Sequence, residues 1–150
     1  MQTYTPENIK SLEKNEIFVF GSNLSGIHAG GAAYIAFKHF GAVWGVGYGL
    51  QGQTFALPTK DKEIITLPLS KVKSYLKDFI EFVYLNPNLK FYLTKIGCGL
   101  AGFTIEEIKT ILWEALEEIA KDNKKEVYLP SNLIIPKEFA KDLFKLTNRH

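Results

Sequence analysis

Apolar and polar residues follow two patterns along the chain, and together these predict strands and helices in turn. Short apolar runs bounded by glycine, proline or polar residues indicate buried strands. They occupy residues 17–20, 54–57, 63–67, 90–95 and 126–129. Apolar residues at helical spacing predict four helices. These are residues 30–40, residues 70–85, the segment that begins at Thr104, and residues 136–146.

This order of elements predicts an α/β sandwich with a largely parallel or mixed sheet. Two of the helices begin with capping signals. Ser70 is expected to cap the second helix, and Thr104 with Glu107 has the T-x-x-E spacing of a capping box. Residues 21–29 and 42–52 are expected to be loops, because glycine and small or polar residues interrupt any regular pattern there.

The composition indicates a single globular domain over residues 1–150, since the chain has 150 residues and 46% hydrophobic content. Cys98 is the only cysteine, which excludes an internal disulfide and fits a reducing compartment. No signal-peptide pattern opens the chain, and no apolar run approaches the ~18 residues that span a membrane. A soluble, cytoplasmic protein without membrane association is therefore expected.

Charge is unevenly distributed, although the net charge is only +2. Residues 17–59 contain no aspartate or glutamate and nine of the 12 glycines, with Lys38 as the only formal positive charge. Such a stretch leaves backbone N–H groups free to meet an anion; alternatively, it is a buried, loop-rich half of the core. Arg149 is the only arginine, which argues against forked phosphate recognition and against nucleic acid as a partner.

One glycine loop, KIGCGLAGF, carries Gly97, Gly99 and Gly102 in a G-x-G-x-x-G spacing between a predicted strand and a predicted helix. A nicotinamide site is disfavoured, because the next predicted strand ends in Pro130 and Ser131 rather than in an acidic residue. Too little chain follows the motif to complete a doubly wound sheet. A phosphate-cradling loop and a tight turn without a ligand both remain open.

A second glycine loop, residues 21–33, also lies between a predicted strand and a predicted helix. Asn23 suits a ribose or a base edge, or it shapes the loop as an Asx-turn. His28 is a candidate acid, base or phosphate donor, or else an exposed loop histidine. Because loops after parallel strands gather at one edge of a sheet, both glycine loops are expected to face one cleft, which favours an elongated ligand that contains phosphate.

Four further side chains are candidates for chemistry or recognition. Lys60 ends a predicted strand beside Asp61 and is either a nucleophile or a solvated lysine. Cys98 lies near a helix start, where its pKa could be lowered, but without an obvious histidine partner a packing role is favoured. Gln51 and Gln53 flank a glycine and either read a base or ribose or form a turn.

Three segments in this order resemble a group of macro-domain-like proteins of bacteria and phages, which are similar to the macro domains that bind ADP-ribose. The segments are FVFGSNLSGIHAGGAAYIAFKHFGA, GLQGQTFALPTKD and FYLTKIGCGLAGF, which fall within residues 17–103. The resemblance implies a three-layer α/β/α macro-like sandwich with a mixed, largely parallel sheet. It also implies a cleft that binds ADP-ribose or a related nucleotide diphosphate sugar.

The resemblance assigns Asn23 to the distal ribose, the small residues that open the first helix to the same end, and the later glycine loop to the diphosphate. The expected ligand-binding residues are Gly21, Ser22, Asn23, Leu24, Gly30, Gly31, Ala32, Gln51, Gln53, Gly97, Cys98, Gly99, Leu100, Ala101 and Gly102. No cofactor and no metal site are expected. The expected partners are an ADP-ribose-like nucleotide and, in an enzyme, an ADP-ribosylated macromolecule.

The sequence departs from the catalytic members of these groups. Many macro-domain hydrolases have an acidic residue soon after the helix-opening glycines, where this chain has Ala32, Ala33 and Tyr34. The terminal ADP-ribose protein glycohydrolase branch is similar at TKIGCGL and uses a lysine, for which Lys60 is the match, and an aspartate, which Ala101 replaces. Binding of an ADP-ribose-like ligand is therefore the primary expectation. A hydrolase that uses Lys60, His28 or Asp61, a protein that sequesters a nucleotide signal, and a structural interaction domain are the alternatives.

Overall fold

The structure, a computed structural model, describes residues 3–141 and residue 143. Its elements follow the predicted alternation of strands and helices. In chain order they are β1 (Glu16–Asn23), α1 (Gly31–His39), β2 (Gly49–Gln51), β3 (Thr54–Lys60), α2 (Leu69–Leu85), β4 (Lys90–Leu93), α3 (Ile105–Asp122), β5 (Leu133–Ile134) and α4 (Lys137–Ala140).

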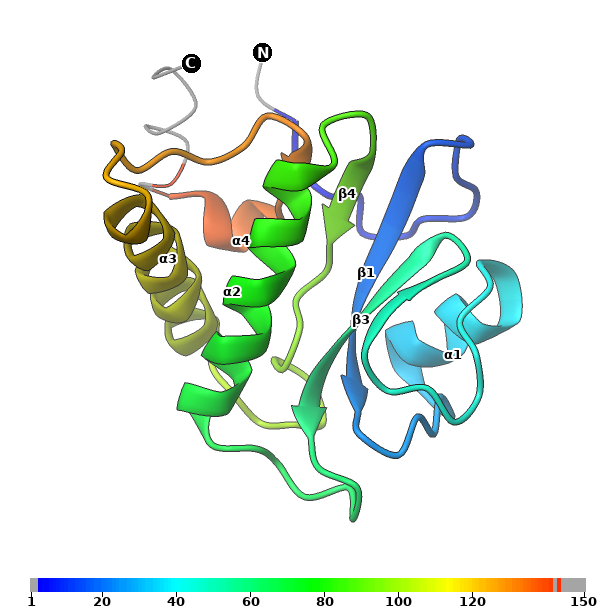
Figure 1. Cartoon of the computed structure of the whole chain (residues 1–150). Helices are drawn as coiled ribbons and strands as arrows, with labels where there is room; N and C mark the ends of the chain where they lie inside the picture. The colour runs from blue at the N-terminus through cyan, green and yellow to red at the C-terminus, as the bar shows by residue number, and fades with distance from the viewer. Residues whose placement is uncertain (1–2, 142, 144–150) are drawn as a thin grey trace.

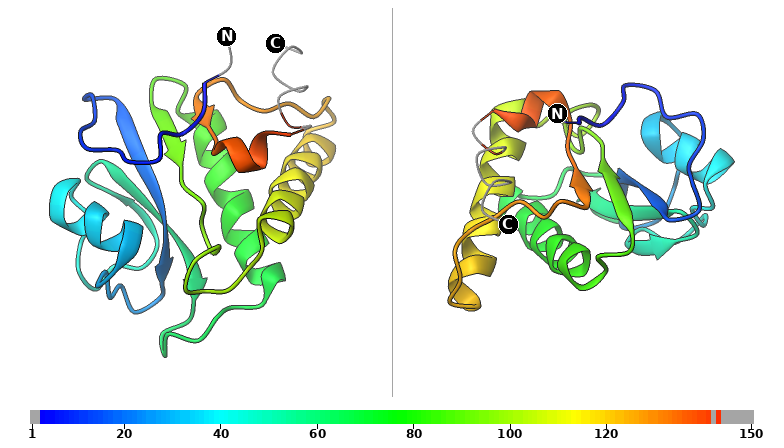
Figure 2. Two further views of the ribbon diagram at one scale, coloured as in Figure 1. Left: turned by 180° about the vertical axis from the view of Figure 1, so that it is seen from behind. Right: turned by 90° about the horizontal axis from the view of Figure 1, so that it is seen from above.

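The five strands of the described residues form one sheet in the order β2-β3-β1-β4-β5 (Figure 1). Every neighbouring pair is parallel except β2 and β3, which are antiparallel. Helix α1 covers one face of this sheet, while α2, α3 and α4 lie on the other (Figure 2). This arrangement confirms the predicted three-layer α/β/α sandwich with a mixed, largely parallel sheet.

Strand β1 carries side chains of both cores, because successive residues of a strand point to opposite faces. Ile17 and Val19 belong to the larger core beneath α2 and α3, whereas Phe18 and Phe20 belong to a smaller core beneath α1. In the larger core the Phe55 ring on β3 contacts the tilted rings of Phe79 and Phe82 on α2, with ring centroids 4.9 and 5.4 Å apart. The smaller core is where α1 attaches, so it determines where the helix presents its N-terminus.

The starts of α2 and α3 test the two capping signals predicted from the sequence. The capping box is confirmed: the Glu107 N–H donates to the Thr104 hydroxyl, and the Thr104 N–H donates to the Glu107 carboxylate. The expectation for Ser70 is wrong, because α2 begins at Leu69 after Pro68, whose φ of −57° suits a helix start. Ser70 therefore lies within the first turn.

Two predicted strands are absent from the described structure. Residues 63–67 form a turn held by the Asp61 carboxylate, which accepts from the N–H groups of Glu63 and Ile65. Residues 126–129 also form no strand. The strand comes later, as β5, because the Asn132 side-chain amide donates to three carbonyls at the end of α2 and in the turn before β4. That contact places the residues after it beside β4.

Two other boundaries differ from expectation. Residues 42–52 contain β2, which pairs with β3 through a tight turn at Gly52, where φ is +57°. The predicted last helix, residues 136–146, is seen as α4 (Lys137–Ala140), and residues 142 and 144–146 lie outside the described part of the chain, as does Arg149.

Candidate functional site

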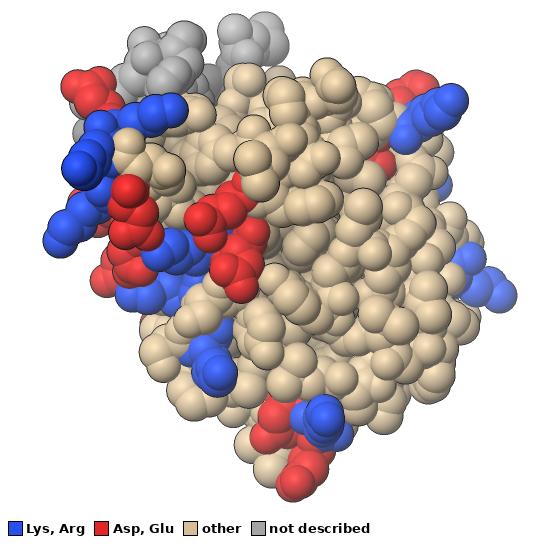
Figure 3. Space-filling view, viewed as in Figure 1, with Lys and Arg blue, Asp and Glu red and all other residues tan. Residues whose placement is uncertain are grey.

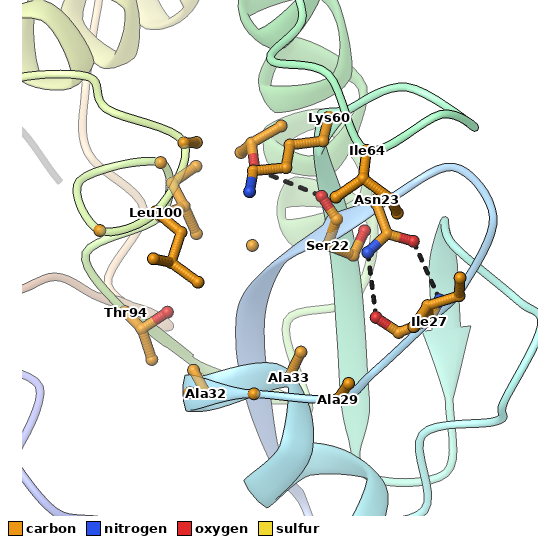
Figure 4. Close-up of a pocket in the computed structure, with 18 of the residues that line it drawn as sticks. Ser22, Asn23, Ile27, Ala29, Ala32, Ala33, Lys60, Ile64, Thr94 and Leu100 are labelled. Atoms are coloured by element: carbon orange, nitrogen blue, oxygen red, sulfur yellow. Dashed lines mark hydrogen bonds between the residues drawn. The ribbon is translucent and has the colours of Figure 1, made fainter.

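A cavity of about 370 Å³ lies at the carboxyl edge of the sheet (Figure 4). Three segments line it: residues 21–33 from the end of β1 to the start of α1, residues 59–64 at the end of β3 and beyond, and residues 94–101 after β4. This volume falls in the range of small-molecule sites, ~300–1,000 Å³. The two glycine loops therefore face one cleft, as their positions after parallel strands predict.

The topology explains why the cavity opens at this point. The chain leaves β1 by way of α1 for β3, on one side of the sheet, and leaves β4 by way of α3 for β5, on the other side (Figure 2). Where neighbouring parallel strands are followed by connections that run in opposite directions, a crevice opens beyond their carboxyl ends. Strands β1 and β4 are that pair, and the last residues of β1 and the residues that follow β4 line the cavity.

The N-terminus of α1 faces this crevice without a competing acceptor. Gly30 is the N-cap residue, no side chain caps the helix, and no acidic residue occupies its first turn. The first N–H groups of any helix lack intrahelical partners, and the helix dipole gives them a partial positive charge. A Cβ built on Gly30 or Gly31 would meet nothing within 4 Å, so a ligand can approach the backbone closely.

The loop after β4 contributes a second set of backbone donors. Its ends are closed by two hydrogen bonds, from the Phe103 N–H to the Gly97 carbonyl at 2.9 Å and from the Gly102 N–H to the Gly99 carbonyl at 3.0 Å. Among the described residues, no backbone carbonyl accepts from the N–H groups of Gly99, Leu100 or Ala101. Successive unpaired N–H groups of this kind form anion-binding concavities.

Lysines are the only ionisable side chains that line the cavity. Lys60 extends from the end of β3 into the cavity, toward the loop that carries Leu100 (Figure 4). Within the described part of the chain Lys60 has no ion pair, whereas Lys95 lies 3.3 Å from Glu138 and 3.9 Å from Glu7. The lining contains no carboxylate. The cavity therefore carries positive charge and suits an anion.

Asn23 shapes the loop, which is one of the two alternatives that its position allowed. Its Oδ1 accepts from the Ile27 N–H and the Ser25 hydroxyl, and its Nδ2 donates to the Ile27 carbonyl, each at 2.9 Å. Both lone pairs of Oδ1 are thus used, and one N–H of the amide remains for a ligand. Ser22 donates its hydroxyl to the Gly47 carbonyl, so it too supports the loop.

His28 lies away from the cavity, which corrects the expectation that it acts as an acid or base there. Its ring is fully buried and packs edge-on against Phe20. Its Nε2 donates to the carbonyls of Val43 and Val46, at 2.9 and 3.1 Å. This histidine holds the segment after α1 in place and does not reach a ligand in the cavity.

Both predicted glutamines serve the fold instead of the cavity. Gln51 is buried, its Oε1 accepts from the Val43 N–H and its Nε2 donates to the Val46 carbonyl. The Gln53 amide donates to the carbonyls of Glu13 and Glu16. Neither residue lines the cavity, so neither side chain is placed to read a base or ribose there.

Three further predicted residues also lie outside the lining. The Asp61 Oδ1 accepts two hydrogen bonds within its own turn, and the residue does not line the cavity. Burial raises the pKa of the Cys98 thiol, so the cysteine is a packing residue rather than a reactive thiolate. Gly102 has a φ of +87° and closes the loop after β4.

Leu24 is likewise absent from the lining, although its N–H donates to the Lys60 carbonyl and so joins two of the lining segments. Most of the residues that line the cavity as predicted are glycine, alanine or serine, and the others are Asn23, Lys60 and Leu100. The full set is Gly21, Ser22, Asn23, Gly30, Gly31, Ala32, Lys60, Gly97, Gly99, Leu100 and Ala101.

Sequence reasoning missed several lining residues. Thr94 and Lys95 follow β4 directly, and their place at the end of a predicted strand was a usable signal. Ile64 has a φ of +65°, a backbone conformation that β-branched residues rarely adopt, and nothing local in the sequence indicates it. Ile27 lines the cavity because Asn23 folds the loop back on itself.

No group of three or more metal-ligating side chains occurs among the described residues, and none of the described helices is long and apolar enough to cross a membrane. Neither a model of a known protein family, nor a curated protein, nor a solved structure shows a significant match to this chain. The function is therefore inferred from the geometry and charge of the cavity.

Proposed function

We propose that this protein binds ADP-ribose or a related nucleotide diphosphate sugar in the cavity at the carboxyl edge of the sheet. The observation that carries the proposal is the convergence of two sets of unpaired backbone N–H groups in a cavity whose lining has lysines but no carboxylate. A diphosphate offers enough oxygens to meet both sets at once.

The rest of the lining suits the less polar parts of such a ligand. Ile27, Ile64 and Leu100 surround the cavity, and the Leu100 side chain is 91% exposed. Apolar side chains at this position can pack against the faces of a sugar or a base, while the backbone holds the phosphates. The remaining N–H of Asn23 provides a polar contact for ribose. The hydroxyls of Thr59 and Thr94 donate to the carbonyls of Ser22 and Val19, so they can act there only as acceptors.

Isothermal titration calorimetry with ADP-ribose, ADP, AMP and inorganic phosphate tests this proposal. ADP-ribose is expected to bind more tightly than AMP, because only a diphosphate reaches both sets of donors. The Gly99→Val variant is expected to lose binding. Gly99 has no positive φ and a Cβ there would meet nothing within 4 Å, so valine fits the loop and its side chain fills space in the cavity that the ligand needs. Ser131→Val, at an exposed loop residue away from the lining, is the control. Absence of heat with all four compounds at millimolar concentration would refute the proposal.

A second candidate function, removal of ADP-ribose from a modified macromolecule, is favoured by Lys60 alone. Its amine extends into the cavity and has no ion pair within the described residues, so it is the one lining group placed to act as a nucleophile. Release of ADP-ribose from modified protein or nucleic acid should then be lost in Lys60→Ala. Tight binding without release from either substrate would instead support a protein that sequesters its ligand.

A further inference from the structure

The turn at residues 99–102, in the loop after β4, is held in place by few contacts. Helices α2 and α3 show the contrast, because the Lys73 Nζ lies 2.8 Å from a Glu118 carboxylate oxygen and the Lys77 Nζ lies 2.9 Å from Asp122. Figure 3 shows lysines and acidic residues side by side over these two helices. Residues 99–102 carry no charged side chain, so no ion pair can hold them in this way.

Packing also contributes little to the position of this turn. The Gly102 N–H donates to the Gly99 carbonyl, which closes the four residues into a β-turn. Leu100 is 91% exposed, and a Cβ built on Gly99 or Gly102 would meet nothing within 4 Å. The turn nevertheless carries the unpaired N–H groups of the second donor set. Its orientation therefore decides where these donors point.

One hydrogen bond joins the turn to another segment of the described chain: the Thr66 hydroxyl donates to the Ala101 carbonyl at 2.9 Å. Thr66 comes after β3 and the turn comes after β4, and β1 lies between these two strands in the sheet. The bond thus links two lining segments across the carboxyl end of β1. The Ala101 carbonyl and the Gly102 N–H belong to one planar peptide unit, so that unit is fixed at both ends.

The segment that carries Thr66 is itself well fixed. Thr66 pairs with Lys60 in an antiparallel bridge, and the Leu67 N–H donates to the Thr59 carbonyl at 2.9 Å. These contacts form a short hairpin after β3. Its tip holds Ile64, which lines the cavity, at a φ of +65°. Strained backbone of this kind persists only where the surrounding structure enforces it, and it is concentrated at ligand sites.

We infer that Thr66 is a positioning residue of the anion site, an inference that rests on the proposed function. Its hydroxyl orients the turn so that the N–H groups of residues 99–101 face a bound diphosphate. Thr66 does not line the cavity and acts through Ala101. The donors at the start of α1 belong to another segment and do not depend on this contact. Thr66 therefore favours ligands whose phosphates reach both donor sets over ligands with a single phosphate.

Calorimetry of the parent protein, Thr66→Val and Thr66→Ser with ADP-ribose, ADP and AMP tests this role. Valine keeps the shape of the side chain but removes the donor, so the affinities for ADP-ribose and ADP are expected to fall about three- to tenfold. The affinity for AMP should change less than about twofold. Thr66→Ser keeps the hydroxyl and is expected to restore the affinity for ADP-ribose. Thr110→Val, at an exposed residue of α3 outside the lining, is the matched control.

The outcomes separate this inference from the proposed function. If the parent protein binds none of the three compounds, both are wrong. If the parent binds ADP-ribose and Thr66→Val binds it equally tightly, or loses ADP and AMP affinity to the same extent, only the role of Thr66 is wrong. A loss that Thr66→Ser does not restore would likewise show that the hydroxyl is not responsible.

A second measurement needs no ligand. Hydrogen exchange of the Gly102 amide, followed by NMR, reports how firmly the turn is held, because this N–H closes it. The exchange rate is expected to rise at least about threefold in Thr66→Val and to stay at the parent value in Thr66→Ser and Thr110→Val. An unchanged rate in Thr66→Val would overturn the inference.

Discussion

Gly21 in β1 lies against Gly97 in the loop after β4: a Cβ built on Gly21 would stand 3.4 Å from the backbone nitrogen of Gly97. Gly97 itself has a φ of +72°, and a Cβ there would come within 2.9 Å of the Phe103 ring. This approach of two backbones brings the loop after β4 next to the end of β1. Gly97 is therefore the position where the loop tolerates no side chain, whereas a Cβ on Gly21 would make only ordinary van der Waals contact.

Gly97→Ala is expected to destabilise the protein by about 2–3 kcal/mol, since alanine is strained at positive φ and its methyl group would press on Phe103. Urea denaturation followed by circular dichroism measures the free energy of unfolding. Gly99→Ala, two residues away, is the control: Gly99 lacks a positive φ and has open space, so its change should stay below ~1 kcal/mol. Equal losses in the two variants would contradict this account of the loop.

His28→Ala is expected to lower the free energy of unfolding by about 2–4 kcal/mol. The substitution opens a cavity beside Phe20 and removes one of the two donors of each of the Val43 and Val46 carbonyls, which keep the Val46 N–H and the Gln51 amide, respectively. His39→Ala, at an exposed position on α1, should cost less than ~1 kcal/mol. If His28→Ala unfolded at the same urea concentration as the parent protein, the structural role of this histidine would be wrong.

Lys60→Ala is expected to weaken ADP-ribose binding about tenfold, because a charge-assisted hydrogen bond to phosphate contributes ~1.5–3 kcal/mol and solvent screens part of it. The loss should shrink as the salt concentration rises. Lys62→Ala is the matched control, since Lys62 is exposed two residues further along and does not line the cavity. Calorimetry at two salt concentrations distinguishes these variants, and identical affinities for both would place the phosphates elsewhere.

Glu16 should make folding sensitive to acid. Burial by itself raises the pKa of this carboxyl, but hydrogen bonds from the Glu13 N–H and the Tyr92 hydroxyl, with Lys90 nearby, outweigh it and hold the pKa below the usual 4.5. Below pH 4.5 the unfolded chain therefore binds this proton more readily than the folded chain, so the stabilisation is present above that pH and is lost as the pH falls through the folded pKa.

Glu16→Gln is accordingly expected to lower the free energy of unfolding by about 1–2 kcal/mol at neutral pH, and by less in acid. Urea denaturation at several pH values from neutral to 3 compares the variant with the parent. Glu63→Gln, at an exposed residue of the turn after β3, should follow the parent at every pH. A constant difference between Glu16→Gln and the parent across this range would show that the carboxylate charge is not involved.

Local signals predicted the elements well where neighbouring residues alone determine them. The capping box of α3 is an example, because Thr104 and Glu107 interact within one turn. Expectations failed where a distant contact dominated. Residues 126–129 have a strand-like composition, but Asn132 binds carbonyls at the end of α2 and in the turn before β4, and β5 begins only after it.

The sequence by itself determined the alternation of strands and helices, the carboxylate-free glycine-rich stretch and the two glycine loops, because these are properties of adjacent residues. Only the tertiary structure decided which candidates face the cavity. His28 and Gln51 turn inward to hold the backbone, while Lys95 joins the lining. The physical reason is that the direction of a side chain depends on the segments packed against it. In this protein those segments are brought together by the order of the strands in the sheet.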